Sequence, residues 1–221
     1  MKKGILMAGI LMFALTRVVV VQGADPSQAA KGVVIKAIGQ VWIGQSNQKD
    51  ERVAGIKDAL QETEYLRTGK KSFAEIEFSN TASARLGPLS SFHFSTQNSN
   101  YVLDQGEGLF SFPKGKGGYT VSTPAFAAGI EGTTVYVKVT RSVVEYACLE
   151  GRCRIGPHTL TPGQRLALSA REAAYAAPKQ TLNLDKFLEK NLLATIFDKP
   201  LLNLPLIREE SRKQKEPRTG G

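Results

Sequence analysis

The chain has 221 residues, of which 42% are hydrophobic, 8% aromatic and 22% charged. This length is enough for one domain, or two small ones, with a buried core, and the apolar fraction is too high for a chain that is disordered throughout. His and Cys occur only twice each. A zinc site of the usual Cys/His kind would need nearly all four of those residues, so we expect no metal and no other cofactor.

The N-terminus is typical of a secretory signal peptide. Basic residues at positions 2 and 3 precede an apolar run over residues 4–16, and small residues follow at Gly23 and Ala24. We therefore predict a signal peptide over residues 1–23, cleavage after Gly23, and a periplasmic or extracellular protein. Arg17 disfavours a membrane span, because a charge at the centre of a span costs about 2.5–3.5 kcal/mol. A retained N-terminal anchor is the alternative.

The positive charge is spread thinly over the rest of the chain. Loss of Lys2, Lys3 and Arg17 lowers the formal charge from +9 to +6, and no basic motif with interleaved aromatic residues follows. A diffuse charge of this kind fits loose attraction to anionic lipid, polysaccharide or acidic protein surfaces. We therefore expect no nucleic-acid partner, and no stable membrane span once the signal peptide is removed.

The body of the chain alternates between apolar and polar residues, as half-buried strands do. The alternation runs through residues 32–43, 72–78 and 133–140. In the second of these, Glu75 and Glu77 are predicted to lie on a solvated face. In the third, the outward positions are Thr134, Tyr136 and Lys138.

Glycine and proline separate these runs every several residues, which favours an all-β fold. We predict one β domain over residues 32–170, an antiparallel β-sandwich or rolled β-sheet. Before the C-terminal region, only residues 50–64 have a pattern that a helix could adopt. A long hairpin loop or an irregular pair of strands fits them equally well, since they are polar and contain Gly55.

The C-terminal region changes to a helical period. Asn183 is a suitable N-cap and Pro200 a suitable stop, and the helix belongs to a helical and extended segment over residues 181–207. Residues 201–207 contain Pro205 and are predicted to be extended, and residues 208–221 are predicted to be disordered. The apolar positions of the amphipathic helix are Leu184, Phe187, Leu188, Leu192 and Ile196.

Two roles are open for this helix. It could cover an exposed edge or end of the β domain, because open sheet edges invite aggregation. Alternatively, its apolar residues could dock a partner protein.

The two cysteines lie in a segment that reads as a β-hairpin. If Glu150 and Gly151 form a two-residue turn, Cys148 faces Cys153 at a position where the Cα atoms are about 4.5 Å apart. This is within disulfide range, and export would place the pair in an oxidising compartment. We therefore predict a structural disulfide, with a redox-active or metal-binding pair as the alternative.

The chain carries no motif of a known catalytic class, and we predict that it is not an enzyme. It has no nucleophile elbow, phosphate-binding loop, dinucleotide fingerprint or metalloprotease helix. His93 alternates with two aromatic residues and is predicted to lie on the polar face of a strand. Residues 114–118 could contact an anion but are more typical of a hairpin tip. A facing carboxylate pair of glycosidase type would have to come from Glu75, Glu77, Asp104 or Glu107.

One stretch is specific enough to indicate a family. In residues 119–133, a strand leads into Thr-Pro, then a run of small residues, then Gly-Ile-Glu-Gly-Thr and another strand. This order resembles the centre of the FecR domain, which usually has Arg where Glu131 stands. Further pieces from residue 32 to residue 168 follow in the expected order. The motif residues are Thr123, Pro124, Gly129, Gly132, Thr133, Gly163 and Gln164. Their expected role is architectural.

The resemblance implies a module of the bacterial envelope. In founding members of the family, this domain is the periplasmic half of a transmembrane regulator, which receives a signal from an outer-membrane receptor and controls a sigma factor. We expect a secreted, non-enzymatic binding or scaffold module that recognises an envelope protein or takes part in surface signalling. The alternative is a cell-surface carbohydrate-binding module that stacks sugars on Trp42, Tyr101 and Tyr136.

Overall fold

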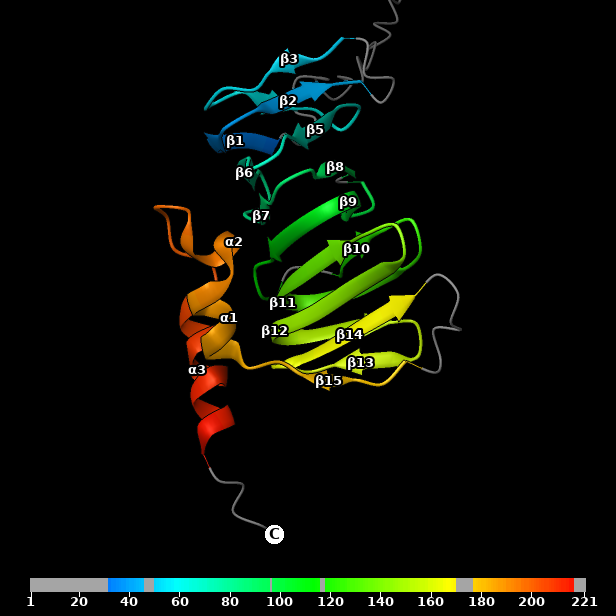
Figure 1. Ribbon diagram of the computed structural model, residues 1–221, viewed down its shortest axis with the longest axis vertical. Coiled ribbons are helices and arrows are strands. Elements are labelled where there is room, and N and C mark those ends of the chain that lie inside the picture. Colours follow the sequence, from blue (N-terminus) through cyan, green and yellow to red (C-terminus); the bar gives the residue numbers. More distant parts are fainter. Residues whose placement is uncertain (1–31, 46–49, 96, 116–117, 170–176, 217–221) are drawn as a thin grey trace, which may run out of the picture.

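The computed structural model describes residues 32–45, 50–95, 97–115, 118–169 and 177–216. The predicted signal peptide and residues 217–221 lie outside these ranges. In the described part, the strands form one sheet of fifteen strands, stacked along the long axis of the molecule, and three helices lie along one side of the stack (Figure 1).

The strands are short at both ends of the stack and long in its middle. They are β1 (Gly32–Ile38), β2 (Val41–Gly44), β3 (Arg52–Val53), β4 (Ala59–Leu60), β5 (Tyr65–Thr68), β6 (Phe73–Phe78), β7 (Ser83–Leu86), β8 (Ser91–Ser95), β9 (Asn100–Ser111), β10 (Tyr119–Ser122), β11 (Ala127–Val139), β12 (Val143–Ile155), β13 (His158–Leu160), β14 (Gln164–Ser169) and β15 (Gln180–Thr181). Residues 50–64 therefore contain two separate two-residue strands, β3 and β4, which agrees with the irregular pair of strands that was one of the alternatives.

The sheet is rolled into two layers because its three long strands bend. The first half of β9 pairs with β8 and its second half with β7, and β11 and β12 also change neighbours along their length. One layer holds β1, β6, β7 and β14, and the other holds β2, β5, β8, β10 and β13. The rolled sheet is confirmed. One detail differs from the antiparallel prediction, since β9 and β10 run parallel.

Glycines stand at the bends of the long strands. Gly106 of β9, Gly132 of β11 and Gly151 of β12 all have positive φ angles, of 89°, 51° and 73°. The register between β11 and β12 shifts at the same point, as a bulge requires. Glycine reaches this region without the steric cost that a Cβ brings. Gly132 therefore stands at the bend of β11.

The larger core lies between the two layers and is rich in aromatic side chains. Its members come from both layers. Its largest fully buried rings are Phe92, Phe94, Tyr101, Phe110, Phe112 and Tyr146. Edge-to-face contacts join several of them, such as Tyr101 with Phe112 at 5.0 Å between ring centroids. Tyr101, a predicted exposed sugar-stacking residue, is therefore an interior residue.

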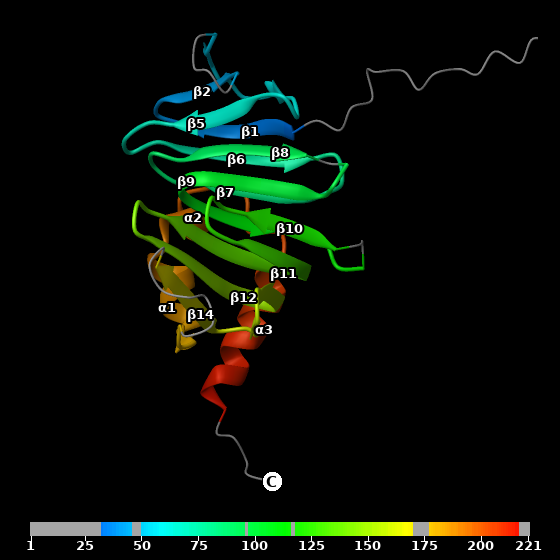
Figure 2. The ribbon, with the colours of Figure 1, turned by 90° about the vertical axis from the view of Figure 1, so that its right-hand side faces the viewer.

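A second core lies outside the first layer, between its outer face and the helices. We call it the outer core. The sheet supplies Phe73, Leu109, Tyr136, Ala147 and Leu149, and the C-terminal segment (residues 182–216) supplies Leu184, Leu193, Phe197, Leu201 and Ile207. Figure 2 shows the other layer of the sheet toward the viewer, with the helices behind it. The helical segment thus covers a face of the sheet, where an edge or end was expected.

The predicted amphipathic helix is two short helices, α1 (Leu184–Lys190) and α2 (Leu192–Thr195). The N-cap prediction is confirmed, because the Asn183 side chain accepts a hydrogen bond from the backbone N–H of Lys186. The break occurs at Asn191, whose side chain caps α2 by accepting from Leu193 N–H at 2.9 Å. An asparagine in this position competes with continued helix by bonding the nearby backbone.

The predictions for residues 201–207 and 208–221 are wrong over a third helix, α3 (Leu204–Lys215). Pro205 lies in its first turn, where a missing N–H and a fixed φ do no harm. Lys213 forms ion pairs with Glu209 and Glu210 at helical spacing, 3.1 and 2.9 Å away. In the described part of the chain, no helix is long and apolar enough to cross a membrane.

Candidate functional site

Arg85 joins the C-terminal segment to the sheet. Its side chain is 2% exposed, and its Nε donates to Oε1 of Glu75 at 2.8 Å. Nη1 donates to the carbonyl of Leu193 at 3.2 Å, and Nη2 donates to the carbonyl of Lys199. The guanidinium carbon also lies 4.8 Å from the centre of the Phe197 ring. One buried side chain on β7 therefore holds the chain on both sides of Phe197.

This contact corrects the prediction for Glu75, which is 4% exposed. The prediction placed it on a solvated strand face, but the C-terminal segment covers that face. Glu77 lies two residues further along β6, remains partly exposed and forms an ion pair with Lys199. A buried carboxylate needs a paired, hydrogen-bonded cation, and Arg85 supplies it.

Asn203 makes a second polar connection between the segment and the sheet. Its buried amide nitrogen lies within hydrogen-bonding distance of Phe112 O, Thr134 Oγ1 and Glu150 Oε2, at 3.1, 3.2 and 3.3 Å. The other oxygen of Glu150 lies 3.3 Å from Nζ of Lys114. Burial raises the pKa of Glu150, and Lys114 partly offsets this effect. Thr134, expected to face outward, is fully buried here.

The raised pKa of Glu150 gives a pH dependence with a definite sign. The folded state binds this proton more tightly than the unfolded chain, so the stability that it contributes is present below the ordinary pKa and is lost as the pH rises through the folded pKa. We expect the free energy of unfolding of the natural chain, minus that of Glu150→Gln, to fall as the pH rises above the ordinary pKa of glutamate. Urea unfolding at several pH values measures it. Glu131→Gln, the same change at an exposed position, is the control. A difference that grows with pH would contradict this interpretation.

Tyr136 connects the sheet to α1. Its hydroxyl donates to Oε2 of Glu107 at 2.6 Å, and its ring packs edge-to-face on Phe187 at 5.3 Å. Burial, reinforced by the Glu107 carboxylate, raises the pKa of Tyr136. Since Tyr136 is 7% exposed, it is not the exposed sugar-stacking residue that was predicted. Of the three residues predicted to stack on sugars, Tyr101 and Tyr136 are buried and Trp42 is half-buried.

The apolar residues predicted to dock a partner lie mostly against the sheet. Leu184 is fully buried in the outer core, and Phe187, Leu188 and Ile196 pack on it while partly exposed. Leu192 differs, at 54% exposed. These contacts support the covering role for the residues of α1 and α2.

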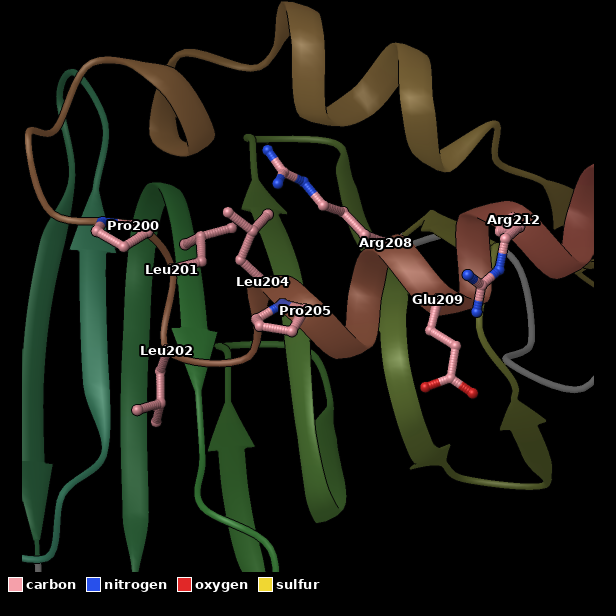
Figure 3. Close-up of a pocket in the computed structure, with 8 residues that line it drawn as sticks. All are labelled: Pro200, Leu201, Leu202, Leu204, Pro205, Arg208, Glu209 and Arg212. Atoms are coloured by element: carbon pink, nitrogen blue, oxygen red, sulfur yellow. The ribbon is translucent and has the colours of Figure 1, made fainter.

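An apolar opening on the surface of the segment lies further along the chain. A groove of about 680 Å³ runs between the loop after α2 and the first turns of α3, and we call it the α3 groove (Figure 3). Leu202 is 47% exposed within it. Arg208 and Arg212 project from successive turns of the helix. The groove is lined by Pro200, Leu201, Leu202, Leu204, Pro205, Arg208, Glu209 and Arg212.

The family-motif residues lie away from this groove and have structural contacts. Thr123 and Pro124 form the turn between β10 and β11, where Thr123 Oγ1 accepts from Phe126 N–H at 3.1 Å. The buried Tyr146 hydroxyl donates to the Phe126 carbonyl at 2.9 Å. Thr133 is fully buried beside the bend of β11.

Two glycines of the motif differ in what they require. Gly163 has a φ of 75° in the turn before β14, where Gln164 accepts from Thr161 N–H through its side chain at 3.0 Å. At Gly129, in contrast, the nearest atom to an added Cβ is the Arg154 carbonyl oxygen at 3.9 Å. Gly129 therefore has room for a side chain.

The hairpin prediction around the cysteines is wrong. β12 continues through Glu150 and Gly151 as a single strand paired with β11, and Gly151 provides the bend where a turn was predicted. Cys148 and Cys153 are free in the structure and fully buried in the large core, and the Cys153 thiol lies beside that of Cys148. The neighbouring thiol, together with burial, raises the pKa of Cys153.

The disulfide itself stays a prediction, to be tested on the purified protein. We expect the purified chain, unfolded without reductant, to react with no thiol reagent, and the reduced chain to react at both cysteines. Because the thiolate is the reactive form and the core holds the Cys153 thiol protonated, the bond has to form before the core closes. The variant Cys148→Ser/Cys153→Ser is the control for background reaction. Two reactive thiols in the unreduced chain would contradict the prediction.

His93 has a carboxylate neighbour that the sequence did not indicate. Its Nδ1 lies 3.3 Å from Oδ2 of Asp104, and its ring lies 4.3 Å from that of Tyr65. The Ser91 hydroxyl contacts the same carboxylate at 3.4 Å. In a catalytic serine–histidine–aspartate relay the serine contacts the histidine, whereas here the serine and the histidine both contact the aspartate. In the described ranges, no group of three or more His, Cys, Asp or Glu side chains could hold a metal ion.

The chain is similar to known proteins over part of its length. No curated protein matches it. Two crystal structures of a candidate anti-sigma factor from Parabacteroides distasonis resemble it, at 12% and 11% identity, each with a TM-score of 0.49. Each resemblance covers 57% of this chain. This chain spans 65% of the length of the first of these structures and 64% of the length of the second. Residues 64–154 match the family model described as FecR protein, which confirms the expected resemblance to the FecR domain over a narrower span than residues 32–168.

Proposed function

We propose that this protein is an exported, non-enzymatic FecR module that recognises another protein in a regulatory or signalling assembly of the bacterial envelope. The FecR domain over residues 64–154 is the observation that carries the proposal. The C-terminal segment completes the domain, because it closes the outer core, and it carries an apolar groove on its own surface.

The contacts of the ionisable side chains support a binding role over a catalytic one. Glu75 is paired with Arg85, Glu107 accepts from Tyr136, and Glu150 lies between Asn203 and Lys114. Each of these carboxylates holds two parts of the fold together. A catalytic carboxylate needs an oxygen that can reach substrate, and at least one oxygen of each of these three carboxylates is engaged in a structural contact.

A crosslinking capture tests the proposal. The tagged, mature chain is crosslinked in the envelope fraction of the source bacterium, and the captured proteins are identified by mass spectrometry. We expect one protein to be enriched, and an excess of untagged chain to compete it away. The same fractionation also tests export, and N-terminal sequencing should begin at Ala24. A bait shown to be folded that enriches no protein under competition would contradict the proposal.

A further inference from the structure

We propose that the α3 groove is the surface that binds the partner, and that it takes an acidic amphipathic segment of a protein, with an apolar side chain in the groove and carboxylates on the arginines. This inference rests on the proposed function and names the chemistry of the partner. The proposed binding surface is the loop before α3 together with α3 itself, in place of the apolar residues of α1 and α2 that were predicted from the sequence.

The apolar part of the groove is exposed but held in place. Leu202 is 47% exposed, while its neighbours Leu201 and Asn203 are only 5% and 7% exposed. Leu201 belongs to the outer core, and Asn203 is hydrogen-bonded to the sheet. Upstream, the carbonyl of Lys199 accepts from Arg85. A surface fixed on both sides loses little conformational entropy when a ligand binds.

The charged part of the groove differs from the rest of α3. Lys213 is paired with Glu209 and Glu210, and Lys215 with Asp185. Arg208 and Arg212 are exposed, and neither has a carboxylate within ion-pair distance among the described residues. Arg212 acts on Glu209 only at longer range.

The spacing of these two arginines indicates the ligand. They are four residues apart on the helix, so their Cα atoms lie one turn apart, and both line the same groove. Their guanidinium groups point in different directions, Arg208 away from Arg212 and Arg212 toward the side of Glu209 (Figure 3). Guanidinium groups bind carboxylates in a planar, two-pronged geometry. A segment with acidic residues one turn apart, beside a leucine-like side chain, would satisfy both the arginines and the apolar residues Leu202 and Pro205.

The test measures binding of a labelled peptide to the whole mature chain by fluorescence anisotropy. The peptide has about 15 residues, enough for a helix, with Leu on one face and Glu one turn apart on its border. One comparison peptide carries Lys in place of Glu, and a second carries Ser in place of Leu. We expect saturable binding of the first peptide only.

Matched variants locate the binding. The variant Arg208→Glu/Arg212→Glu should weaken binding at least about tenfold, because each charge pair would become a repulsion. Lys186→Glu/Lys190→Glu makes the same charge change on α1 and should leave binding unchanged. Leu202→Ser should weaken binding, and Leu192→Ser, at a leucine of similar exposure outside the groove, should not. Equal binding of the Lys peptide, or equal loss in both charge variants, would overturn the proposal.

Two further outcomes separate the possible failures. If the crosslinking capture yields its partner equally well with Arg208→Glu/Arg212→Glu, the groove proposal is wrong and the proposed function stands. Vesicles that contain phosphatidylglycerol test a lipid surface as the occupant. Binding to these vesicles that depends on the two arginines, without binding of the acidic peptide, would also overturn the proposal.

Discussion

Replacement of Arg85 with alanine is expected to lower the free energy of unfolding by about 3–5 kcal/mol, the range for breaking a buried ion pair. The change leaves the Glu75 carboxylate buried without its cation and removes the donors to the Leu193 and Lys199 carbonyls. Since these carbonyls lie in the C-terminal segment, limited proteolysis within residues 182–216 should also accelerate. Urea unfolding followed by tryptophan fluorescence and circular dichroism measures the loss.

Two matched variants show whether burial is the cause. Glu77→Ala removes the neighbouring carboxylate, whose ion pair with Lys199 is exposed, and should cost less than about 1 kcal/mol. Glu75→Leu/Arg85→Leu removes both charges and keeps apolar volume, so it should be more stable than Arg85→Ala. If Arg85→Ala and Glu77→Ala cost the same, the C-terminal segment is not held by a buried ion pair.

Replacement of Gly106 with alanine is expected to cost about 2–5 kcal/mol, the sum of left-handed strain and overpacking. Its φ is 89°, and an added Cβ would lie 2.5 Å from the Cα and 2.3 Å from the Oγ of Ser90. Ser90 has little room to move, because it is buried and its hydroxyl accepts from the N–H of Glu107. The bend of β9 therefore depends on a residue without a side chain. Thermal and urea unfolding measure the cost.

Gly129 provides the control for Gly106. It lies in the family motif, has no positive φ, and has no atom closer than 3.9 Å to an added Cβ. Gly129→Ala should therefore change the free energy of unfolding by less than about 0.5 kcal/mol. A comparable loss in both variants would mean that glycine content, and not the bend, is what the sheet requires.

The inward faces of the strands could be predicted from the sequence, but the outward faces could not. Alternation correctly assigns Val135 and Val137 to the interior. The same pattern assigns Glu75 and Tyr136 to solvent, because both are polar or amphipathic. Glu75 is linked through Arg85 to Leu193 and Lys199. Tyr136 packs on Phe187. These partners all lie far along the chain. Local alternation contains no information on what later covers a face.

The structural role of a glycine between two apolar runs is also ambiguous in the sequence. A Glu-Gly pair between two apolar runs is typical of a hairpin turn, yet Gly151 bends a continuous strand. Both structures need a positive φ, and the choice depends on whether the flanking runs pair with each other or with a third strand. Here β12 pairs with β11 on both sides of the bend.

The α3 groove could not be predicted from the sequence because two local features favour a non-helical chain after residue 200. Pro205 suggested extended chain, but a proline in the first turn is compatible with a helix. The polar residues after it suggested disorder, although Lys213 stands three and four residues after two glutamates, a spacing that favours helix. These two features together could have indicated α3.

The central claim is that this FecR module recognises a protein through the α3 groove. Its most direct test places a photocrosslinking amino acid at Leu202 in the living cell, with Leu192 and Val53 as exposed control positions. We predict that position 202 captures one envelope protein, that positions 192 and 53 do not, and that Arg208→Glu/Arg212→Glu abolishes the capture. Capture of the same protein from Val53, or no capture from position 202 by a folded protein, would contradict the claim.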